Sequence, residues 1–154
     1  MSQQALKTHL AQAEQAGIYR FSAPEREALE KASKALGFAV FNVNLEGCAD
    51  LDAILPTLGK TLNFPNWYGA NLDALNDCLT DLSWHEAKGY LLLFSEADAL
   101  YAATASFSAL NEVLTAAIEE WQTQGIPFWV FYEFQRAEPL DGLPNLPSLL
   151  PSLS

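Results

Sequence analysis

The chain has few of the residues and segments that define several common classes of protein. Its 154 residues include two cysteines, Cys48 and Cys78, and two histidines. None of these has the spacing of metal ligands, so neither a disulfide scaffold nor a metal site is expected. No run of eighteen apolar residues occurs, and MSQQALKTHL at the N-terminus has no apolar segment after its first lysine. We therefore expect no transmembrane helix, no secretory signal and a reduced, cytoplasmic setting.

Basic residues are also scarce, and their scarcity is local. The chain has 8 Lys and Arg against 19 Asp and Glu, a formal net charge of −11. Residues 40–135 hold 13 acidic and 2 basic residues, whereas residues 1–39 sum to +1 and residues 136–154 to −1. Such a surface repels nucleic acid phosphates and anionic lipid, and it attracts a basic partner. We expect a basic protein partner, no direct nucleic acid binding and no membrane binding.

The pattern of apolar residues predicts an α/β fold. Half of the residues are apolar, enough for the core of one domain. Segments with helical spacing alternate with short apolar runs, which predicts a mainly parallel sheet packed with helices. The helical segments are 2–16, 23–36, 51–62, 71–82 and 107–121, and the strand-like runs are 38–45, 90–94 and 126–134. IYRF at 18–21 is a candidate extra edge strand.

The chain divides into three parts on this pattern. Residues 1–37 form an N-terminal helical extension packed on the core, residues 38–135 an α/β domain, and residues 136–154 a tail rich in proline and leucine. Leucines in the tail recur at every third position between four prolines, the period of a polyproline-II helix. We expect this leucine edge to pack against the body or against a neighbouring subunit, which leaves a homodimer open.

The predicted helix at 71–82 separates apolar from polar side chains. Asn71 suits the N-cap, and the polar face carries Asp73, Asn76, Asp77 and Asp81. Asp73 and Asp77 stand four residues apart, where like charges repel by about 0.2–0.5 kcal/mol. No lysine or arginine lies within four residues of Asp77. These carboxylates suggest a surface that binds a cationic group outside the chain.

A short aromatic loop leads into this helix. Pro65 and Gly69 bracket Trp67 and Tyr68, and rigid aromatic side chains beside carboxylates are typical of interface hot spots. We expect one of the two rings to be buried and the other exposed.

The segment FPNWYGANLDALNDCLT, residues 64–80, carries a resemblance to a known family. It is similar to the signature of the barstar family, intracellular protein inhibitors of secreted guanyl-specific ribonucleases such as barnase. The similarity is ungapped over residues 54–80 and looser over the strands and the last helix. The chain resembles longer bacterial members, since nothing in the family's type member matches residues 1–36 or the tail.

The resemblance implies a barstar-like fold, with a three-stranded parallel sheet packed with helices, and a binding surface made of the acidic helix and the loop before it. Family members place an aspartate where the substrate phosphate would lie, and that position falls on Asp77. Asp73 falls on a second acidic contact, and Glu120 on a contact in the last helix. The remaining positions carried over are Trp67, Tyr68, Asn71 and Asn76. The family's type member has a tyrosine in place of Trp67, a tryptophan in place of Asn76 and an acid in place of Gln124.

Two alternatives stand beside this hypothesis of an antitoxin-like inhibitor. A regulatory or assembly module of the same fold would bind a non-nuclease partner through the N-terminal extension or the tail. An enzyme is the less favoured alternative, because Asp73 and Asp77 lack a neighbouring nucleophile or base. The triplet Gly59-Lys60-Thr61 lacks the upstream glycine of a phosphate-binding loop. No cofactor is expected.

Overall fold

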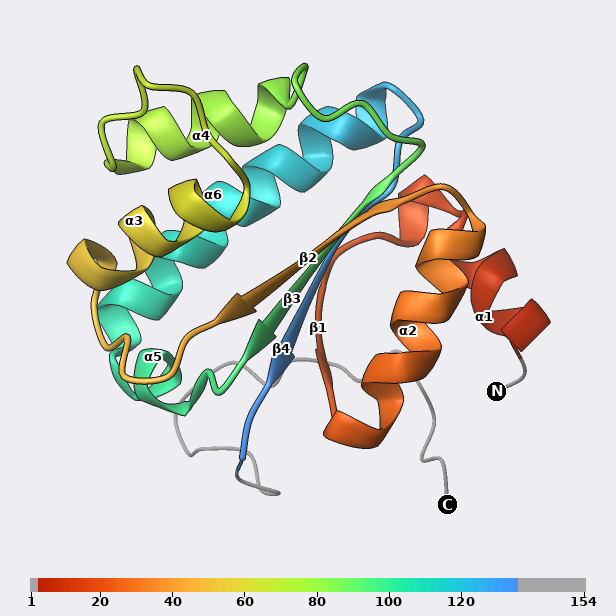
Figure 1. The fold of residues 1–154 in the computed structure, drawn as a ribbon, viewed down its shortest axis with the longest axis horizontal. Helices are drawn as coiled ribbons and strands as arrows, with labels where there is room; N and C mark the ends of the chain where they lie inside the picture. Colours follow the sequence, from red (N-terminus) through yellow and green to blue (C-terminus); the bar gives the residue numbers. More distant parts are fainter. Residues whose placement is uncertain (1–2, 136–154) are drawn as a thin grey trace.

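A computed structural model describes residues 3–135 of the chain (Figure 1). The N-terminal elements are α1 (Gln3–Leu10), the short 3-10 helix η1 (Ala13–Gln15), β1 (Ile18–Phe21) and α2 (Ala23–Ala35). The elements that follow are β2 (Ala39–Asn44), α3 (Leu51–Thr61), α4 (Leu72–Asp81), β3 (Tyr90–Ser95), α5 (Asp98–Ala102), α6 (Thr104–Thr123) and β4 (Phe128–Glu133). The predicted tail lies outside the described residues. Within residues 3–135, no helix is long and apolar enough to cross a bilayer.

The sheet has four parallel strands in the order β1-β4-β3-β2. The expectation of three strands is therefore wrong, while the candidate edge strand at 18–21 is confirmed as β1. Its register places Ile18 beside Val130. The physical reason lies in β4, whose residues are all buried. β3 pairs with one edge of this buried strand, so the backbone N–H and C=O groups of its other edge need a second partner, and β1 supplies it.

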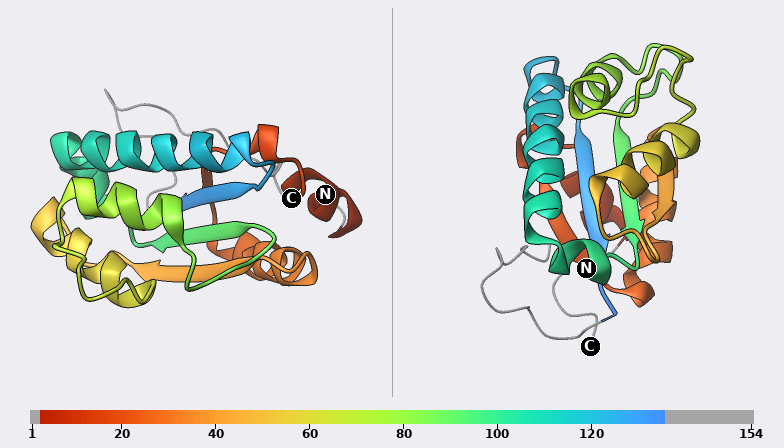
Figure 2. Two further views of the ribbon diagram at one scale, coloured as in Figure 1. Left: turned by 90° about the horizontal axis from the view of Figure 1, so that it is seen from above. Right: turned by 90° about the vertical axis from the view of Figure 1, so that its left-hand side faces the viewer.

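Helices cover both faces of the sheet, in two layers that the views of Figures 1 and 2 separate clearly. The larger core joins one face of the sheet to α3, α4, α5 and α6. The smaller core joins the other face to α1 and α2, and includes Trp129 and Phe131 from β4. The N-terminal elements thus cover apolar side chains of the central strands that would otherwise face water.

The predicted helix at 2–16 is interrupted in the structure. α1 ends at Leu10, and η1 follows after Gln12, whose backbone is extended. Side chains from far along the chain donate hydrogen bonds to backbone carbonyls of this region. The Trp129 indole donates to the Leu10 carbonyl at 2.9 Å, and the Gln122 amide donates to the Ala13 carbonyl at 3.0 Å. These tertiary bonds compete with continuation of the helix.

Local signals set most other element boundaries. At the start of α2, the Ser22 N–H donates to Glu25 Oε1 at 2.7 Å, as in a capping box. At its end, Gly37 adopts φ +81°, a conformation that favours glycine.

α3 continues through Pro56, which is exposed. The short helix α5 was absent from the expected elements.

Candidate protein-binding surface

The loop between α3 and α4 has a defined backbone. Asn63 and Ala70 bracket it with positive φ values of 55° and 52°. The Phe64 N–H donates to the Gly59 carbonyl of α3, and the Tyr68 N–H donates to the Pro65 carbonyl, both at 2.9 Å. The loop is therefore closed by its own hydrogen bonds and attached to the helix that precedes it.

The two aromatic residues of this loop point in different directions. Trp67 is 56% exposed and is the one large hydrophobic side chain exposed among residues 3–135. Tyr68 is half-buried, and its hydroxyl donates to the Leu55 carbonyl at 2.7 Å. Burial is the main cause that raises the pKa of Tyr68 to about 12. The expectation of one buried and one exposed ring is confirmed, with Trp67 available to a partner.

α4 begins as the sequence predicts. The Asn71 side chain accepts a hydrogen bond from the Ala74 N–H at 2.8 Å, so Asn71 is the N-cap. Leu75, Cys78 and Leu79 are buried against the core. Asn71 itself is exposed, so its cap role leaves the rest of the side chain on the surface.

The opposite side of α4 carries an acidic row, which we define as Asp73, Asp77 and Asp81. All three are exposed and stand four residues apart along the helix. The salt bridges between residues 3 and 135 join Arg26 to Glu30 and to Glu133, so neither involves this helix. The acidic row thus has no cation from the described part of the chain to neutralise it.

The carboxylates of α4 also affect the ionisation of a thiol on the buried side of the helix. The pKa of the Cys78 thiol is raised to about 11, first by burial and then by the charges of Asp77 and Asp81. A thiol with this pKa stays protonated near neutral pH, which fits a core residue rather than a reactive one.

The remaining predicted site residues lie on α4 and on its neighbour α6. Asn76 is half-buried, and Glu120 is exposed on α6. α4 and α6 lie side by side in Figures 1 and 2, and the Trp121 indole donates to the Leu79 carbonyl at 2.8 Å. The structure therefore brings the elements that carry Trp67, the acidic row and Glu120 to one side of the sheet.

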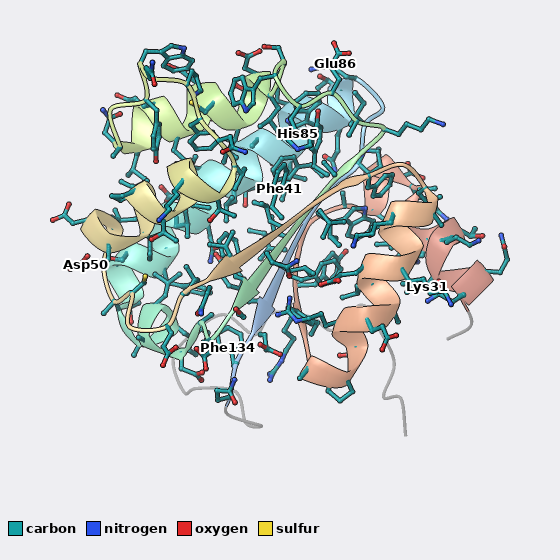
Figure 3. All side chains as sticks on the ribbon, in the orientation of Figure 1. Lys31, Phe41, Asp50, His85, Glu86 and Phe134 are labelled. Atoms are coloured by element: carbon teal, nitrogen blue, oxygen red, sulfur yellow. The ribbon has the colours of Figure 1, made fainter. Side chains whose placement is uncertain are left out.

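The loop that follows α4 makes two aromatic contacts with other elements. The Trp84 indole donates to the Leu62 carbonyl at 3.2 Å, so this ring covers the C-terminal end of α3. The rings of His85 and Phe41 meet edge to face, with centroids 5.0 Å apart (Figure 3). No spacing in the sequence signals this second contact, because it joins a loop to a distant strand.

A second group of carboxylates lies at the carboxyl ends of the strands. The pKa of Glu96 is raised, chiefly by a hydrogen bond to Glu46 and by the charge of Glu46, with smaller effects from Glu133 and Asp98. Within the described residues, no group of three or more acidic, histidine or cysteine side chains could hold a metal ion.

Comparison with protein families identifies a match. The model of the family described as Barstar (barnase inhibitor) matches residues 38–133, more than half of the chain. The matched segment runs from the start of β2 to the end of β4 and contains the aromatic loop, α4 and α6. A comparison with curated proteins finds no significant match.

Solved structures show the fold at low sequence identity. The Aeropyrum pernix ORC2 protein in its ADP form has a TM-score of 0.61 at 15% identity, over 88% of this chain and 40% of that one. Its ADPNP–ADP complexes give 0.51 at 16% identity, over 86% and 40%. The Drosophila ORC bound to DNA gives 0.52 at 16% identity, over 95% and 40%. The chain therefore spans about two-fifths of these proteins, and the likeness concerns the fold alone.

Proposed function

The chain belongs to the Barstar (barnase inhibitor) family, and we propose from this membership that it binds and inhibits a basic ribonuclease. The observation that carries the proposal is the position of the family match. It includes the exposed Trp67 and the whole acidic row, whose charges have no counterion among the described residues. Action within the cytoplasm of a bacterial cell, in the manner of an antitoxin, is part of the proposal.

The inhibitor acts by exclusion and charge complementarity, without chemistry of its own. Asp77 takes the place of the substrate phosphate against the cations of the nuclease active site, and Asp73 makes a second acidic contact. Arginine pairs well with such carboxylates because its planar guanidinium can donate two parallel hydrogen bonds. Trp67, in the loop that leads into α4, supplies a rigid apolar contact, and Glu120 extends the contact onto α6. The net charge of −11 accelerates encounter with a basic enzyme.

The test is inhibition of barnase and of other basic guanyl-specific ribonucleases by the full chain and by two variants. Asp77→Ala removes one charge from the acidic row. Glu27→Ala removes one charge from an exposed position on α2, which packs on the opposite face of the sheet. We expect Asp77→Ala to weaken inhibition about 30-fold or more, as for truncation of one partner of a buried charge pair. Glu27→Ala should inhibit like the wild type.

Equal inhibition by Asp77→Ala and the wild type would reject the assigned surface. Absence of inhibition across the nuclease panel would favour the alternative, a regulatory or assembly module. The N-terminal elements have a structural task in the smaller core, where Leu6, Leu10 and Leu29 are buried. That observation favours the α4 surface over the N-terminal extension as the site of binding.

A further inference from the structure

Tyr68 belongs to the aromatic loop, but its side chain is directed into the protein. Its hydroxyl is bound to α3 through Leu55, and its ring meets the Phe64 ring edge to face at 4.7 Å. We propose that Tyr68 is a positioning residue, whose ring sits in a socket left by Gly59 and thereby fixes the loop that presents Trp67. The proposal rests on the proposed function for the use of this loop, and on contacts within the chain for the rest.

Gly59 makes the socket because it has no side chain. It lies within α3 and does not adopt a positive φ, so the helix backbone does not require glycine there. A Cβ atom at this position would lie 2.6 Å from Cε2 and 2.8 Å from Cδ2 of Tyr68. These separations are shorter than van der Waals contact, so any other residue would displace the ring. The glycine of the Gly59-Lys60-Thr61 triplet therefore has a packing role.

Two further rings complete an aromatic clamp, which we define as Phe64, Tyr68 and Trp84. The Phe64 and Trp84 rings meet edge to face at 6.0 Å, and the Trp84 indole is bound to the Leu62 carbonyl. The clamp attaches the loop to the C-terminal half of α3, directly before α4 begins. A loop that is ordered before binding loses less conformational entropy on binding, so the clamp raises affinity without contacting the partner.

The first arm of the test needs no partner. In an otherwise wild-type chain, Gly59→Ala should lower the melting temperature and accelerate hydrogen exchange in residues 63–70 by a larger factor than in β3 and β4, where exchange follows the global free energy of unfolding. In a Tyr68→Ala background the socket is empty, and the same substitution should raise the melting temperature by about 1–4 °C, since alanine favours a helix more than glycine. In a Tyr68→Phe background, which keeps the ring, the effect should stay destabilising.

A stabilising effect of Gly59→Ala in all three backgrounds would overturn the socket. Unchanged exchange in residues 63–70 would overturn the positioning role, even if Tyr68→Ala failed to fold.

The second arm measures binding to immobilised barnase. Gly59→Ala should weaken binding about two- to tenfold, the cost of ordering released side chains. Unchanged affinity together with accelerated exchange in the loop would also overturn the positioning role. If barnase binds neither the wild type nor any variant, the measurement is made with a ribonuclease of the panel that the wild type inhibits. Absence of any such enzyme counts against the proposed function, and the partner-free arm still decides the role of Tyr68.

Discussion

Replacement of Asp77 by asparagine should stabilise the free protein. Asp77 is the middle member of the acidic row, so it lies four residues from both Asp73 and Asp81. Each such pair of like charges costs about 0.2–0.5 kcal/mol, and the substitution removes both repulsions. Asparagine has nearly the same shape and helix propensity as aspartate. The expected gain is therefore about 0.4–1 kcal/mol, or about 1–4 °C in melting temperature for a chain of this size.

The assay is thermal and urea unfolding at low and high salt. Because all three carboxylates are exposed, salt should screen the repulsion, and the gain should shrink as ionic strength rises. Glu112→Gln is the matched control, since Glu112 is exposed on α6 and has no acidic residue three or four positions away. A loss of stability in Asp77→Asn, or a gain of the same size in the control, would refute the reasoning. A gain combined with lost inhibition would indicate that the acidic row is kept for binding at the expense of stability.

Two further predictions concern groups with a raised pKa. At pH 8 a thiol reagent should label the half-buried Cys48 in the native protein. Cys78 is buried and has a pKa of about 11, so only about one-thousandth of it is thiolate at this pH, and it should react only after unfolding. Rapid labelling of both thiols in the native protein would contradict this prediction. A hydrogen bond to Glu46 raises the pKa of Glu96 above its ordinary value of 4.5, so the folded state binds this proton more tightly than the unfolded state does. Stability therefore falls as pH rises from the pKa of the unfolded state through that of the folded state. Glu96→Gln should therefore unfold at a higher temperature than the wild type at neutral pH, and this gain should vanish below pH 4.5; a gain independent of pH would exclude the carboxylate as its cause.

Much of the fold follows from local sequence signals. The segment before α4 contains its own N-cap at Asn71, and the residues behind it keep a strict division between a buried and an exposed face. The apolar runs at β3 and β4 identify strands buried on both faces. These signals act over a few residues, so they can be identified from one sequence. The sequence predicts that one ring of Trp67 and Tyr68 is exposed, but only the structure shows that it is Trp67.

The errors have causes that lie far away in the chain. The helix expected over residues 2–16 ends early because Trp129 and Gln122, more than 100 residues later, bind its carbonyls. The number of strands was wrong because four residues at β1 carry too weak a pattern to establish pairing with β4. The fit of the Tyr68 ring over Gly59 could not be predicted either, because it depends on how the loop folds back onto α3. In each case the decisive contact joins segments that no local pattern relates.

The pairing of β1 with β4 has a consequence for the order of folding during synthesis. The ribosome makes β1 before the other three strands and β4 after them, so β1 cannot join the sheet until β4 has been made. Such distant contacts slow folding, because a long loop must close before any stabilising contact forms. Until then the apolar faces of α1 and α2 lack the central strands that cover them. A chain with this topology therefore gains its native sheet only after β4 has been made.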